Sequence, residues 1–291
     1  MEQQNKPASS DRRSFFKTAG LATLSAAAGA YIIGGAKPAQ AQAPQGMFRF
    51  DTPAQIFTAA LIAEDLATTF YYNGLIGKAI QDPNLAGPGG TATAVTSAGN
   101  MGNVQYLQAA LSEEIAHANL MRTLLGGAAP GTDPVQTFYL PTGCFDTLPA
   151  FLKVLDTLEN AFIGAYLEAV RGFSYMAALL LNGNVVGYTL NGVGFSSAQV
   201  QYYTQVAASI MGVEAEHRVL GRVISNTNPA NNVCYEQTDG LDAVYNGPTS
   251  AVAALTPFLS PGTGLSPYSL ATALSNQAMV SIPCTGTIPA F

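Results

Sequence analysis

The chain has 291 residues, a formal net charge of −6 and only 10% charged residues, while 48% of its residues are hydrophobic. No basic run remains beyond the N-terminal segment, so nucleic acid and anionic membrane surfaces are not expected as partners. So few charges predict a large buried fraction, or a surface that contacts protein, including a second copy in a homo-oligomer.

The first 43 residues resemble a twin-arginine export signal. The run 11–17 holds two adjacent arginines, two phenylalanines and a lysine, and a weakly apolar stretch from about 19 to 36 follows. Small residues offer cleavage sites near Ala41 or Ala43. The alternative is an uncleaved membrane anchor, although the stretch falls short of about 20 strongly apolar residues. We therefore expect the twin-arginine machinery to export the folded chain to the periplasm or out of the cell, a route that metalloproteins often take.

Four long amphipathic helices are predicted at about 52–75, 101–125, 147–181 and 196–225. The first and the fourth open with capping boxes, Thr52 to Gln55 and Ser196 to Gln199. Each helix carries acidic residues near mid-length on an otherwise apolar face, and no segment shows convincing strand alternation. The sequence thus predicts an all-α four-helix bundle.

The connections differ in character. The link 76–100 is rich in Gly, Ala and Thr and is expected to form a loop or a small extra helix. The link 127–146 could stretch about 60 Å, more than the roughly 37 Å length of a 25-residue helix. We therefore predict one long crossover between the second and third helices.

Residues 227–291 contain seven prolines and many Ser, Thr and Gly residues, and only 265–279 looks helical. This pattern predicts a C-terminal extension that packs on the bundle with one short helix; disorder is the alternative. Outside the cytoplasm a disulfide between Cys234 and Cys284 is expected. Cys144 would then be either a buried thiol or an intermolecular bridge.

The two histidines of the chain each follow a glutamate by three residues, a spacing that places both side chains on one helical face. Each pair is preceded, by 50 or 55 residues, by a single glutamate with a tyrosine seven residues after it. The two sets are Glu64, Tyr71, Glu114 and His117, and Glu159, Tyr166, Glu214 and His217. A tandem helix-hairpin repeat explains this pattern and places six ligands around a pseudo-two-fold axis.

Four carboxylates and two neutral imidazoles offset the charge of two divalent cations, and mixed oxygen and nitrogen ligation suits iron or manganese. We predict that Glu114 and Glu214 bridge the two ions. Each ion would be completed by one further pair, Glu64 with His117 or Glu159 with His217. Tyr71 and Tyr166 are expected to donate hydrogen bonds to ligand carboxylates.

The remaining nearby carboxylates fall off these faces. Glu216 and Glu168 lie about 200° and 180° from Glu214 and Glu159, respectively. Two more, Glu113 and Asp65, sit about 100° from their neighbours and are predicted at the rim or the surface. Three alternatives stay open: Glu168 in place of Glu159, faces turned to water, and a bundle that keeps these residues without binding metal.

Over about 52–226 the chain resembles the ferritin-like domain family that includes desiccation-related proteins. The likeness lies in both Glu-x-x-His runs and in residues around the single glutamates: Leu66, Phe70, Tyr71, Gly74, Leu75, Leu158, Ala165 and Tyr166. It implies a ferritin-like bundle at 44–226 with a dinuclear site, and no single reaction. Two functions are compatible with this: a di-iron or di-manganese oxidoreductase acting on dioxygen or peroxide, and a non-catalytic stress or envelope protein.

Overall fold

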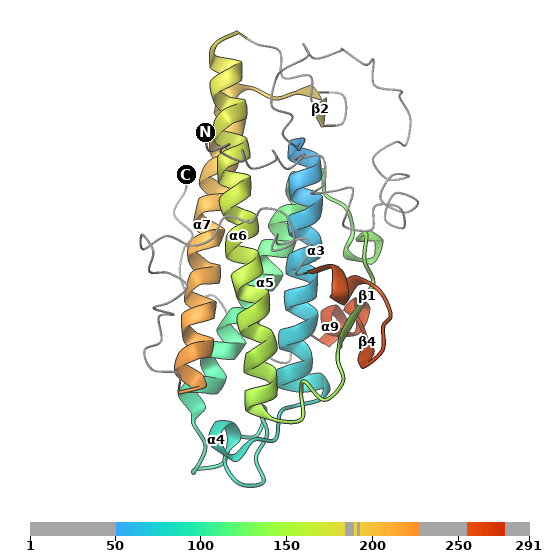
Figure 1. Cartoon of the computed structure of the whole chain (residues 1–291), viewed down its shortest axis with the longest axis vertical. Coiled ribbons are helices and arrows are strands. Elements are labelled where there is room, and N and C mark those ends of the chain that lie inside the picture. Colours follow the sequence, from blue (N-terminus) through green and yellow to red (C-terminus); the bar gives the residue numbers. More distant parts are fainter. Residues whose placement is uncertain (1–50, 184–188, 191–192, 227–254, 277–291) are drawn as a thin grey trace, which may run out of the picture.

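The computed structural model describes residues 51–183, 189–190, 193–226 and 255–276 (Figure 1). Four long helices form the body of the molecule: α3 (Pro53–Tyr72), α5 (Met101–Leu124), α6 (Leu148–Leu181) and α7 (Ser197–Ile224). The mostly helical fold expected from the sequence is confirmed, and the four helices start and end within a few residues of the predicted positions.

Local sequence accounts for the helix starts. In α3 the Thr52 hydroxyl accepts a hydrogen bond from the Gln55 N–H at 3.1 Å, and the Gln55 side chain accepts one from the Thr52 N–H at 2.9 Å. Ser196 and Gln199 make the same reciprocal pair at the start of α7. Both predicted capping boxes are confirmed; each satisfies two backbone donors that the first helical turn leaves without partners.

The four helices are arranged as two hairpins. Helix α3 packs against α5, and α6 packs against α7. Figure 1 shows α5 and α6 starting at the same end of the bundle, so the chain between them returns along its length. This return is the predicted long crossover, and it allows the two hairpins to bring four helix midpoints together.

Two apolar clusters fill the bundle on either side of its middle. One contains Phe70 stacked on Phe151, with ring centroids 4.5 Å apart and an interplanar angle of 4°. The other contains Phe57 and Tyr203, whose rings meet edge to face at 4.8 Å. The mid-helix carboxylates lie along each helix close to where one cluster gives way to the other.

Short strands correct the expectation of a chain without them. Strand β1 (Thr137–Pro141), in the crossover, pairs antiparallel with β4 (Leu265–Ser269), and β2 (Thr189–Leu190) pairs with β3 (Val193–Gly194). The stretch 265–279 was predicted as helix, but of its described residues, 265–276, the first five form strand β4 and the helix α9 (Leu270–Asn276) begins after them. Pro267 explains this, because proline lacks the N–H that a helix interior requires, whereas an edge strand tolerates it.

The remaining elements are single turns or little longer. They are the π-helix η1 (Asn73–Gly77), α4 (Pro83–Ala86) in the first link, and the 3₁₀ turns η2 (Pro130–Thr132) and η4 (Thr256–Leu259). Helix α9 packs against α3, so the described part of the C-terminal extension lies on the bundle (Figure 1).

Several predictions concern residues that the structure does not describe. The export signal lies outside the described residues, as do Cys234 and Cys284 with their predicted disulfide. Cys144 is a free thiol, 3% exposed. Within the described ranges, no helix combines the length and apolar character needed to cross a bilayer.

Candidate metal centre

The six predicted ligand residues meet at the middle of the bundle. They form two overlapping groups whose ligand atoms all lie within 4.8 Å of one another. One group is Glu64, Glu114, His117 and Glu214, and the other is Glu114, Glu159, Glu214 and His217. Glu114 and Glu214 belong to both groups and therefore link them.

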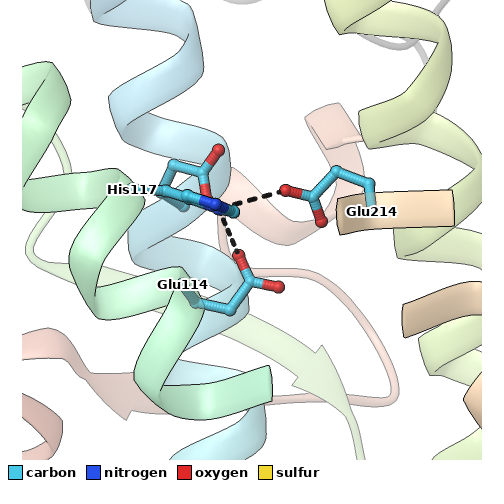
Figure 2. Close-up of side chains that lie close together, drawn as sticks. Glu114, His117 and Glu214 are labelled. Carbon is cyan, nitrogen blue, oxygen red and sulfur yellow. Dashed lines mark ion pairs between the residues drawn. The ribbon is translucent and has the colours of Figure 1, made fainter. Parts of the chain in front are cut away.

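The Nδ1 atoms of both imidazoles face the carboxylates. His117 Nδ1 lies 3.3 Å from Glu214 Oε1 and 3.4 Å from Glu64 Oε2. Figure 2 shows His117 with Glu114 from its own helix on one side and Glu214 from α7 on the other. His217 Nδ1 lies 3.0 Å from Glu114 Oε1 and 3.4 Å from Glu214 Oε2. Each nitrogen therefore points into a group of oxygens contributed by different helices.

Eight buried atoms of this cluster have no hydrogen-bond partner. They are both carboxylate oxygens of Glu114 and of Glu214, Oε2 of Glu64 and of Glu159, and Nδ1 of each histidine. Leaving so many buried polar atoms unsatisfied costs free energy, which makes each of them a group that needs explanation. A bound metal ion would satisfy such atoms, and the set combines carboxylate oxygens with histidine nitrogens.

The outer carboxylates are held by tyrosines from the opposite hairpin. Tyr71 on α3 donates a hydrogen bond to Glu159 Oε1 on α6 at 2.7 Å. In the same way Tyr166 on α6 donates to Glu64 Oε1 on α3. The predicted contact between tyrosine and ligand carboxylate is present, but it crosses between the hairpins. Each phenol orients one carboxylate and leaves its second oxygen directed to the cluster.

The cluster is almost sealed from solvent. The four carboxylates are at most 2% exposed and His217 is 1% exposed, whereas the His117 side chain is 12% exposed. Burial raises the pKa of Glu64 and of Glu159, because their charged forms lose hydration. Burial opposes the charged form of His117 too, but the adjacent carboxylates raise its pKa above the ordinary value. A bound cation would supply the positive charge that stabilises the ionised forms of these buried carboxylates.

Three other glutamates on these helices, Glu113, Glu168 and Glu216, are not members of the cluster. Glu168 pairs with Arg171 at 2.6 Å and lies outside the cluster, while Glu159 lies within it. Glu216 is exposed. Glu113 lies at the rim, as predicted, with its side chain 48% exposed, but its Oε2 is 2.8 Å from His217 Nε2. Sequence reasoning missed that contact because Glu113 and His217 belong to different hairpins.

The prediction for Asp65 was wrong. Asp65 is fully buried and pairs with Arg122 Nη2 at 2.5 Å. Arg122 also binds Asp133 of the crossover, at 2.7 Å from Nη2. The crossover and α5 therefore cover Asp65. From its position on α3 alone, Asp65 would lie at the rim. We name Asp65, Arg122 and Asp133 the crossover clamp.

The family model described as a ferritin-like domain matches residues 52–189. The match covers α3, α5 and α6 and ends before α7, so it does not include the second Glu-x-x-His run, which the structure brings to the same centre. Comparisons with curated proteins and with solved structures gave no match. The chain is thus a mostly helical protein whose residues 52–189 match a ferritin-like domain, with clustered carboxylate and histidine side chains suited to metal binding.

Proposed function

We propose that this protein holds two iron or manganese ions at the middle of the bundle and uses them in redox chemistry with dioxygen or peroxide. The observation that carries the proposal is the set of eight buried ligand atoms without hydrogen-bond partners. Four carboxylates and two neutral imidazoles balance two divalent cations, and this mixed donor set favours iron or manganese over magnesium or calcium.

In the proposed chemistry the ions supply electrons, and the chain holds the ligands and excludes water. When bound, two ferrous or manganous ions supply two electrons, which with two protons reduce dioxygen to hydrogen peroxide, or hydrogen peroxide to two water molecules. Tyr71 and Tyr166 hold the outer carboxylates, and the apolar clusters on either side keep bulk water away. The His117 side chain is 12% exposed, which supports entry of a small oxidant from its side.

Export by the twin-arginine route belongs to the same proposal. That route carries folded proteins, so the ions would be inserted in the cytoplasm and retained in the periplasm or outside the cell. A role in oxidative or desiccation stress fits a protein that consumes oxidant in that compartment.

Metal analysis of the protein purified from its native compartment tests the binding step. We expect two iron or manganese ions per chain, and loss of both in the Glu114→Ala, Glu214→Ala double variant. A Glu168→Gln, Glu216→Gln double variant is the control, since these carboxylates lie outside the cluster. Wild-type protein that is free of metal as isolated, and that takes up neither ion on incubation, would contradict the proposal.

A second candidate function is a non-catalytic stress or envelope protein in which metal, if bound, is structural. The near-complete burial of the four carboxylates favours it, because a reactive centre needs access for its oxidant. Addition of ferrous iron under air separates the two functions. Oxidoreductase activity predicts oxygen consumption and a rise in near-ultraviolet absorbance, whereas a scaffold predicts bound metal without consumption of oxygen or peroxide.

A further inference from the structure

The two halves of the metal centre differ in the residue that precedes each bridging glutamate. Glu113 precedes Glu114 on α5, whereas Val213 precedes Glu214 on α7. The other chemical groups of the two halves repeat: single glutamate, tyrosine, bridging glutamate and histidine. One position of the repeat therefore carries a charge in one hairpin and an apolar side chain in the other.

Glu113 reaches across to the histidine of the opposite hairpin. Its Oε2 lies 2.8 Å from His217 Nε2. A carboxylate accepts hydrogen bonds, so the Nε2–H of His217 donates to it. This contact fixes the ring orientation and directs Nδ1 toward Glu114 and Glu214. A carboxylate behind a ligating histidine also makes the imidazole a stronger donor to a metal.

His117 has no such support from the described residues. Among the described residues its contacts are made by Nδ1, and the equivalent of Glu113 in the repeat is Val213, whose side chain offers no acceptor. The His117 side chain is also 12% exposed, against 1% for His217. One imidazole is thus buried and anchored, and the other lies nearer solvent without an anchor.

We define the inner position as the ion site of Glu159 and His217, and the outer position as that of Glu64 and His117. We propose that Glu113 makes these two positions inequivalent, so that the inner ion binds more tightly and exchanges more slowly than the outer ion. The proposal rests on the dinuclear centre proposed above and identifies Glu113 as a positioning residue that acts through His217.

The expected size of the effect follows from the kind of contact. Removing a partner of a metal-ligating histidine typically weakens metal binding 10- to 100-fold. Glu113 is half exposed, so replacing it leaves no buried cavity and folding should be unaffected. The loss of metal affinity should therefore affect the inner position and leave the outer position unchanged.

Anaerobic titration of the apo full-length chain with manganese(II), followed by calorimetry, tests this directly. We expect two binding steps in the wild type, with dissociation constants at least about tenfold apart. Glu113→Ala should weaken the tight step about 10- to 100-fold, and Glu113→Gln, which keeps an acceptor without the charge, should give a smaller loss. Glu216→Ala removes an exposed carboxylate one residue from His217 and should leave both steps unchanged, which controls for overall charge.

Histidine variants assign the effect to a position. In a His117→Ala background, which keeps the inner position, Glu113→Ala should still weaken manganese binding. In a His217→Ala background it should have no further effect. Val213→Glu supplies the missing carboxylate by the repeat symmetry and should tighten the weak step.

The imidazoles can also be observed without metal. Because the chain has only two histidines, nitrogen-15 labelling of histidine gives two ring systems by NMR. We expect a solvent-protected Nε2–H for His217 that Glu113→Ala loses and Glu216→Ala keeps.

The outcomes distinguish the proposal of a dinuclear centre from the proposal that its two positions are inequivalent. Two equal binding steps, or a Glu113→Ala variant that binds like the wild type, would overturn the inequivalence and leave the dinuclear centre standing. Wild-type protein that binds no manganese(II) would overturn both.

Discussion

The crossover clamp allows a quantitative test of what holds the long connection to the bundle. Arg122 is 3% exposed, and its guanidinium lies 2.5 Å from Asp65 and 2.7 Å from Asp133. Its Nε adds contacts of 3.0 and 3.2 Å to the two oxygens of Asp133, and Nη1 lies 2.9 Å from Asn119. Replacing Arg122 by Met keeps much of the apolar stem but leaves two buried carboxylates without their cation.

We expect Arg122→Met to lower the free energy of unfolding by about 3–5 kcal/mol, the usual cost of removing one partner from a buried ion pair. Urea unfolding followed by circular dichroism, with a chelator present in every sample, measures this loss as a lower midpoint. Arg171→Met is the matched control. Arg171 is 41% exposed and pairs only with Glu168 in the described contacts, so its loss should stay below about 1 kcal/mol.

A third variant tests the cause. If uncompensated charge is responsible, adding Asp65→Asn and Asp133→Asn to Arg122→Met should recover more than half of the lost stability, because neutral amides cost less to bury. The reasoning fails if Arg122→Met unfolds within 1 kcal/mol of the wild type, or if the triple variant is less stable than the single one.

Three further predictions follow from single side chains. Tyr71→Phe removes the donor to Glu159, so manganese(II) affinity measured by calorimetry should fall about tenfold or more; an unchanged dissociation constant would contradict this. Burial raises the pKa of Cys144 to about 12, so iodoacetamide should label its peptide, as read by mass spectrometry, only after unfolding in urea. Rapid labelling of the native protein would refute it. Burial, with repulsion from Glu168, raises the pKa of Asp51 to about 7. The folded state therefore binds a proton more tightly than the unfolded state, and stability is lost as the pH rises from about 4 to 7. Asp51→Asn should be more stable than the wild type at pH 8, with the difference fading toward pH 4; equal urea midpoints at pH 8 would exclude this.

Much of the fold was predictable because its signals are local. Capping boxes depend on residues three apart, and the four helix ranges follow from apolar periodicity along each segment. The strands were missed because β1 and β4 are stable only as a pair, and residues 137 and 269 are far apart in the chain. A five-residue segment carries too little pattern to reveal a partner at that distance.

Within the candidate metal centre, too, the sequence predicts what depends on local spacing and misses what depends on contacts between distant segments. Spacing along one helix determines that Glu114 and His117 share a face, and that Tyr71 lies two turns from Glu64. It does not determine which face another helix presents. The contacts that cross between hairpins, from Tyr71 to Glu159 and from Glu113 to His217, therefore appear only in three dimensions.

The sequence by itself determined the helices, the repeated order of chemical groups and the candidate ligand types, because each of these depends on neighbours within a few helical turns. Tertiary structure alone decided the burial of Asp65, the exchange of tyrosines between hairpins and the unequal support of the two histidines. These features depend on how separate helices pack against one another. Residue spacing along a single helix does not determine that packing.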